Sequence, residues 1–153
     1  VRAKENRFAS FDTLNKDSVT FATLDGEMSQ IAVNETFPQA KQKSLPGLTA
    51  ATDRFEMIAG GKVDATLMEG GIGEEYMAHN PGKIKQLGTA PLRLGGSTLI
   101  IPKNEFQMKQ MLDTAIDSMI WTGALERIVK QHEKYPGTML LPALPYQPAT
   151  GKK

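Results

Sequence analysis

Hydrophobic positions in the first part of the chain switch between the period of a strand and that of a helix. Residues 17–24 carry the short, β-branched apolar run of a strand, and residues 27–37 repeat apolar side chains at helical spacing. Residues 40–45 can form a second strand, after a proline that stops the helix. The pattern therefore predicts strand, helix and strand in succession.

The same order repeats in the following segment. Residues 53–60 predict a helix, with Thr52 as its expected N-cap and two glycines at its expected end. Residues 62–68 are apolar on both faces, which is typical of a central strand in a parallel sheet. Because strand–helix–strand connections of this length favour parallel pairing, we expect an α/β fold with three α/β/α layers and a mainly parallel sheet.

The second half of the chain predicts further strands and helices. Residues 70–73 are expected to form a glycine-rich turn before a short helix, and residues 83–88 and 96–102 are predicted to be strands. The longest apolar stripe lies on the helix predicted at 105–121, and a last helix is expected at 124–135.

Composition narrows the classes of function. The chain has 153 residues, of which 40% are hydrophobic and 23% are charged, as in one ordinary globular unit. A net charge of +1 gives no electrostatic footprint for nucleic acid or an anionic membrane, so no nucleic-acid partner is expected. No apolar run approaches the roughly 20 residues that a membrane-spanning helix needs.

The sequence also gives no reason to expect a cofactor or a metal. It contains no cysteine, which excludes disulfides and thiolate zinc sites. His79 and His132 lack neighbouring ligands at zinc spacing, and the glycine-rich segment at 70–73 lacks the full dinucleotide-binding pattern. We therefore expect neither a cofactor nor a metal site.

Four segments, taken in order, resemble a known receptor family. They are FASFDTLNKDSVTFA (8–22), FEMIAGGKVDATLME (55–69), STLIIPKNE (97–105) and LDTAIDSMIWTGALERIVKQHEKY (112–135). Together they resemble the second lobe of a type 2 periplasmic solute-binding protein, the extracellular solute-binding protein family 3 that serves ABC importers of amino acids. The fold that this implies is a periplasmic binding protein-like type 2 lobe.

The resemblance implies a domain organisation. It predicts a solute-binding lobe over residues 1–135, with hinge strands at about 1–8 and 96–102 and C-terminal helices at 105–135. Residues 136–153 are expected to form an extended tail.

The resemblance also implies partners and a location. In that family two lobes close on a ligand, and most of the first lobe would precede Val1, so a missing N-terminal lobe is an expected partner. An ABC transporter membrane permease and a periplasmic or extracytoplasmic location are implied as well. Without the first lobe, the apolar stripe on 105–121 is expected to be uncovered and to favour a homodimer.

Glu69 is the leading candidate for a ligand contact. It follows the strand predicted at 62–68, and ligands of open parallel sheets bind at the carboxyl ends of the strands. The resemblance implies that an acidic residue here pairs with the amino group of the solute, through a charge-assisted hydrogen bond. The alternative is that Glu69 only caps or solvates a turn. Asp64 is expected to be structural and to bond the backbone near the start of the strand.

The turn that opens the first helix is the second candidate. The resemblance implies a glycine followed by threonine or serine, which would cradle a carboxylate, but this chain has Asp25 and Glu27. Two negative charges would repel a carboxylate, so an amine-bearing solute without one at this point becomes plausible beside an amino acid. The alternative is that Asp25 is only an N-cap. Further candidate contacts are Thr23, Ser29, Thr49 and Thr52.

The expected function is therefore solute binding for an ABC transporter, without catalysis. Two alternatives stay open, a dehydratase-like enzyme on the same scaffold and a sensor input domain. As an enzyme, the chain would need an acid or base in the cleft, for which Glu69 and Asp25 are the candidates.

Overall fold

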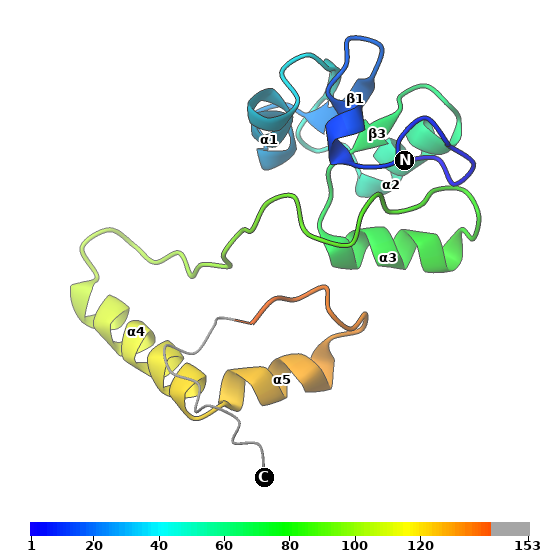
Figure 1. Ribbon diagram of the computed structural model, residues 1–153. Coiled ribbons are helices and arrows are strands. Elements are labelled where there is room, and N and C mark those ends of the chain that lie inside the picture. The colour runs from blue at the N-terminus through cyan, green and yellow to red at the C-terminus, as the bar shows by residue number, and fades with distance from the viewer. Residues whose placement is uncertain (142–153) are drawn as a thin grey trace. The chain divides into compact units, whose positions relative to one another are not determined.

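The computed structural model of the protein describes residues 1–141 and divides into two compact units, Val1–Leu94 and Gly95–Lys153 (Figure 1). Residues 142–153, which make up most of the predicted tail, lie outside the described residues.

A short parallel sheet forms the centre of the first unit. Its strands β1 (Thr20–Leu24), β2 (Lys41–Leu45) and β3 (Ala65–Thr66) lie in the order β2-β1-β3. β1 pairs in parallel with β2 over its whole length and with β3 through Phe21 and Ala22. The predicted parallel sheet is therefore confirmed, with β1 at its centre.

One helix covers each face of this sheet, and a third packs on the second of them, as the ribbon in Figure 1 shows. They are α1 (Met28–Thr36), α2 (Ala51–Ala59) and α3 (Gly70–His79). Phe21 of β1 packs with Val33 of α1 on one face, whereas the next residue, Ala22, packs with Ile58 of α2 and Tyr76 of α3 on the other. Successive side chains of a strand point to opposite faces, so the expected α/β/α layers are present. A short 3-10 helix, η1 (Phe11–Leu14), precedes the sheet.

The third strand is shorter than predicted. Residues 62–68 were expected to pair, but β3 spans only Ala65–Thr66. The backbone N–H of Leu24 in β1 donates to the hydroxyl of Ser29 at 3.2 Å. Because this side chain takes a backbone donor at the end of β1, the ladder between β1 and β3 ends early.

Two local expectations about helix starts are wrong. α2 has Ala50 at its N-cap, so Thr52 lies inside the first turn and does not cap it. α3 begins at Gly70, so the predicted glycine-rich turn is the first turn of a helix. Glycine is a poor helix former, but burial of Tyr76 between the helix and α2 outweighs that local preference.

The strands predicted at 83–88 and 96–102 do not form. Within the described residues, the first segment makes one isolated antiparallel bridge, between Arg2 and Ile84, and residues 96–102 join no sheet. Residues 1–8 likewise form no hinge strand beyond that bridge. Backbone hydrogen bonds join residues 1–3 to residues 83–85, but they form no more than this one bridge. Residues 96–102 have no neighbouring strand in residues 1–141 to take their backbone hydrogen bonds, and an apolar run becomes a strand only beside such a neighbour.

The second unit contains α4 (Phe106–Trp121) and α5 (Ala124–His132), which confirm the two predicted C-terminal helices. Gly123 joins them with φ 69°, a left-handed conformation that glycine adopts without strain. No residue of α4 is buried, and Met108 and Ile116 of the predicted stripe are 46% and 40% exposed. Self-association through this stripe stays a prediction.

Glu5 and Asp64 tie the N-terminal segment to the sheet. The Glu5 carboxylate is almost fully buried and accepts hydrogen bonds from Arg2 at 3.0 Å and from Arg7 at 2.7 Å. Arg7 also donates to Asp64, whose other oxygen accepts the backbone N–H of Thr20 at 2.9 Å. The expected structural role of Asp64 at the start of the strand is confirmed.

This arrangement predicts a specific acid sensitivity. Hydrogen bonds from Arg7 lower the pKa of Glu5 from 4.5 to about 2. Because the folded-state pKa is depressed, the carboxylate stabilises the fold above pH 4.5 and that contribution is lost as the pH falls towards 2. We expect the melting temperature of Glu5→Gln to fall less steeply than that of the wild type between these pH values. Parallel curves in thermal unfolding by circular dichroism would contradict this role of Glu5.

Candidate functional site

The candidate site lies at the carboxyl ends of β1 and β3. The chain leaves β1 towards α1 on one face of the sheet and leaves β3 towards α3 on the other face. Adjacent parallel strands whose connections diverge in this way form a topological switch point, where ligands of open α/β sheets bind. We call this region, with the first turns of α1, α2 and α3, the carboxyl edge.

Glu69 sits at the carboxyl edge, as the sequence predicts. It is the N-cap residue of α3, and its backbone carbonyl accepts the N–H of Gly73 at 3.1 Å. The side chain makes no capping hydrogen bond and is exposed. The carboxylate thus does not cap the helix, and its contact with a ligand stays a prediction.

Asp25 follows β1 but does not cap α1. The N-cap residue of α1 is Glu27, so the N-cap interpretation of Asp25 is wrong. The Asp25 carboxylate accepts a hydrogen bond from the hydroxyl of Ser44. The Asp25 backbone N–H donates to the backbone carbonyl oxygen of Leu45 at 2.9 Å. These contacts hold Asp25 against the end of β2.

The neutral candidates Thr23 and Ser29 are below the surface. Thr23 is fully buried in β1, and its hydroxyl oxygen has no hydrogen-bond partner among residues 1–141. Ser29 is 6% exposed, accepts the N–H of Leu24 and donates to Glu27 Oε2 at 2.7 Å. Ser29 therefore orients Glu27 at the edge, and direct solute contacts of Thr23 and Ser29 stay predictions.

Thr49 and Thr52 lie farther along the chain, at the start of α2. Thr49 is half-buried in the turn after β2, where its N–H donates to Pro46 at 2.9 Å, and Thr52 is exposed on α2. Within the described part of the chain, no hydrogen bond joins either threonine to Glu69 or Asp25. Their role as contacts also stays a prediction.

Arg54 is the functional candidate that the sequence interpretation missed. It lies in the first turns of α2, is only 4% exposed, and extends between α1 and the end of β3. Its Nη1 atom is 3.6 Å from Glu27 Oε2, and its Nη2 atom is 3.4 Å from Met68 Sδ. Burial lowers the pKa of Arg54, and the charge of Glu27 opposes that shift. The carboxyl edge therefore holds a buried cation as well as carboxylates.

A signal for Arg54 was present in the sequence. Arg54 precedes Ile58 by four residues and follows Ala51 by three, so it falls on the apolar stripe that faces the sheet. A charged residue on such a stripe is rarely buried without a partner. The partner, Glu27, is far away in sequence, at the N-cap of α1.

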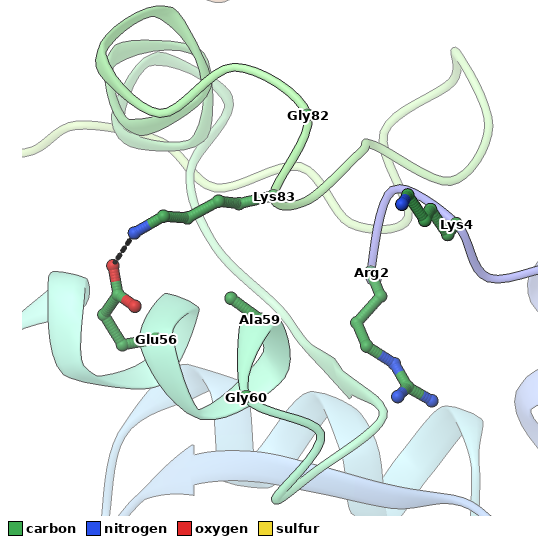
Figure 2. A pocket seen from close by; sticks show the side chains of 7 residues that line it. All are labelled: Arg2, Lys4, Glu56, Ala59, Gly60, Gly82 and Lys83. Carbon is green, nitrogen blue, oxygen red and sulfur yellow. Dashed lines mark hydrogen bonds and ion pairs between the residues drawn. The ribbon is translucent and has the colours of Figure 1, made fainter.

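A separate hollow of about 470 Å³ lies at the opposite end of α2. Figure 2 shows Ala59 of α2 and its C-cap residue Gly60 on one side, with Arg2 and Lys4 of the N-terminal segment across from them. Lys83 also lines it but pairs with Glu56 at 2.8 Å. The carbonyl end of a helix carries negative partial charge, so this hollow is a poorer anion site than its basic residues suggest.

Metal and membrane sites find no support in the described residues. Among residues 1–141, no cluster of three or more histidine, aspartate or glutamate side chains could hold a metal ion. No helix in that range is both long and apolar enough to cross a bilayer.

Comparison with known proteins identifies the fold. No protein-family model and no curated protein matches the sequence. Among solved structures, the chain is similar to the ancestral amino acid-binding protein AncCDT-1, a precursor of cyclohexadienyl dehydratase, with a TM-score of 0.60 and 19% identity. That match covers 85% of this chain and 52% of the other.

A second similar structure is a variant of an ancestral cyclohexadienyl dehydratase, AncCDT-3, with a TM-score of 0.49 and 19% identity over 84% of this chain and 52% of that one. The chain thus spans about half the length of the solved structures it matches. At 19% identity the likeness concerns the fold alone. Together with the parallel sheet and its two helical layers, it shows that the chain has a periplasmic binding protein-like fold.

Proposed function

We propose that this chain is one lobe of an extracytoplasmic solute receptor and binds an amino acid or another amine-bearing solute at its carboxyl edge. The observation that carries the proposal is the exposed carboxylate of Glu69 at the topological switch point, where it takes no part in capping α3. A carboxylate in that place can accept charge-assisted hydrogen bonds from an ammonium group.

In the proposed mechanism, a second lobe closes over the solute, and contacts such as that of Glu69 favour the closed state. The likeness in fold to an ancestral amino acid-binding protein supports a solute-binding scaffold of this kind. A periplasmic location and delivery to an ABC transporter permease complete the proposal. Catalysis is not part of it.

A thermal-shift screen against amino acids, polyamines, betaines and small organic acids tests the proposal. A solute that binds only the folded state at a hundred times its Kd should stabilise the protein by about 2.7 kcal/mol. We expect the melting temperature to rise with an amine-bearing solute. No rise with any compound, in a folded sample, would contradict solute binding by this lobe.

The Glu69→Gln variant tests the role of the carboxylate. Loss of a hydrogen bond to a charged group costs about 1.5–3 kcal/mol, so the Kd of the active solute should rise by roughly ten- to a hundredfold. Glu74→Gln is the matched control, because it removes the same charge from the same helix five residues later. Isothermal titration of both variants gives the two Kd values, and equal values would refute the contact.

Mixtures of the protein with a solute found in the screen can also distinguish binding from catalysis. Nuclear magnetic resonance spectra of the solute should stay unchanged over hours if the chain only binds it. Conversion of the solute would favour the enzyme alternative, in which Glu69 and Asp25 are the candidate acid–base groups.

A further inference from the structure

The guanidinium of Arg54 is buried but incompletely satisfied. Only 4% of the residue is exposed, and among the described residues neither Nε nor Nη1 has a hydrogen-bond partner. Nη2 donates only to the thioether sulfur of Met68, which is a weak acceptor. A buried cation ordinarily gains hydrogen-bonded partners that compensate for its lost hydration.

Glu27 neutralises this cation without completing its hydrogen bonds. Its Oε2 lies 3.6 Å from Arg54 Nη1, which is longer than a hydrogen bond, and the same oxygen accepts the Ser29 hydroxyl at 2.7 Å. The Glu27 side chain is 47% exposed, so it lies between the buried guanidinium and solvent. Water can therefore hydrate Glu27 if the ion pair opens, whereas Arg54 stays inside.

We propose that Arg54 is an anion subsite of the carboxyl edge, where a carboxylate group of the solute replaces Glu27 on the guanidinium. The proposal rests on the solute-binding function proposed above and refines the class of solute. A carboxylate that is not held by Ser29 can form two parallel hydrogen bonds with a guanidinium at about 2.7–2.9 Å. The exchange breaks one ion pair and forms another, so no charge is left buried alone.

This assignment changes the interpretation of the acidic turn before α1. Taken from the sequence, Asp25 and Glu27 would repel a carboxylate. In the structure Asp25 bonds Ser44, and Glu27 lies beside the cation Arg54, so the edge holds a positive charge that a carboxylate can pair with once Glu27 has moved into solvent. The proposed solute therefore carries an ammonium group for Glu69 and a carboxylate for Arg54.

The test uses acetate as the probe and the Nε–Hε signal of Arg54 as the reporter. The whole chain is labelled with ¹⁵N and titrated with sodium acetate against sodium chloride at constant ionic strength. The signal is assigned by its absence in Arg54→Met. We expect acetate to shift it saturably in the wild type, with no comparable effect of chloride.

Glu27→Gln gives the sharpest expectation, because removal of this carboxylate should strengthen anion binding. Glutamine can still accept the Ser29 hydroxyl, but it no longer competes for Arg54. If Glu27 occupies the guanidinium about 90% of the time, its removal lowers the apparent Kd of acetate about tenfold. The control is Glu35→Gln, in which the exposed Arg93 loses the carboxylate that lies 2.6 Å from its Nη1 atom. This variant should leave acetate binding at Arg54 unchanged.

Three results would overturn the proposal. One is no acetate-dependent shift of the Arg54 signal in the wild type. Another is an unchanged or weaker affinity in folded Glu27→Gln. The third is a shift of the Arg93 signal with the same Kd, which would show nonspecific anion binding. If Glu27→Gln does not fold, the wild-type titration alone decides, with the Arg93 signal as its internal reference.

The two proposals can fail separately. Acetate binding at Arg54 needs no second lobe, and it is measured without any amine-bearing solute. Acetate binding without any amine-bearing solute in the screen would support the subsite and contradict the proposed function. A solute whose binding depends on Glu69, found together with no acetate-dependent shift of the Arg54 signal, would support the proposed function and contradict the subsite.

Discussion

Phe21→Ala should lower the free energy of unfolding of the first unit by about 3–5 kcal/mol, the usual cost of removing a buried aromatic ring from a core. Phe21 is fully buried in the central strand β1. Its ring stacks on Phe37 with centroids 5.0 Å apart, and the same cluster contains Val33 of α1 and Ala65 of β3. The substitution thus leaves a cavity where the sheet meets α1.

Urea unfolding followed by circular dichroism measures this effect. The matched control is Phe106→Ala, because Phe106 is 73% exposed at the start of α4, and such surface changes usually stay within about 0.5 kcal/mol. A midpoint for Phe21→Ala no lower than that of the control would show that β1 is not the centre of the core.

Arg54→Met should act in the opposite direction and stabilise the protein by up to about 4 kcal/mol, the upper end of the gain when a whole buried ion pair is replaced by apolar side chains. Methionine keeps the unbranched stem that packs in α2 and removes a cation whose Nε and Nη1 have no hydrogen-bond partner in residues 1–141. Glu27, which is left alone, is half-exposed and can be hydrated.

Thermal unfolding of Arg54→Met beside Arg93→Met checks this expectation. Arg93 forms an exposed ion pair with Glu35, and such surface pairs contribute about 0–1 kcal/mol, so its removal should change little. A marked loss of stability in Arg54→Met alone would mean that the buried pair holds α1 to α2. A gain, together with loss of acetate binding, would mean that the site keeps its cation at the expense of stability.

Elements whose pattern is local could be predicted from the sequence. β1, β2, α1, α4 and α5 form close to their expected positions because strand and helix periods depend on neighbouring residues. The strands expected at 83–88 and 96–102 do not form because a strand needs a partner along its length, which a local pattern does not supply. Residues 83–85 pair only with residues 1–3, and residues 96–102 pair with no strand in residues 1–141. The start of α3 was missed because burial of Tyr76 overrides the weak helix preference of the preceding glycines.

The position of the candidate site in the fold could be predicted from the sequence, but the buried positive charge of Arg54 could not. The rule that ligands bind at the carboxyl ends of parallel strands placed Glu69 correctly at the edge. The pairing of Arg54 with Glu27 depends on how α1 and α2 pack around the sheet, and the sequence separates these residues by an entire strand. The acidic side chains of this edge are therefore visible in the sequence, whereas the cation beside Glu27 becomes apparent only in the structure.

The polar character of β2 has a consequence for aggregation. β2 is an outer strand of the sheet, and its residues Lys41 and Lys43 are exposed. An outer strand offers unpaired backbone groups to strands of other molecules, and lysines placed there repel a second copy of the same strand. Growth of the sheet from one molecule to the next is thereby disfavoured along this edge.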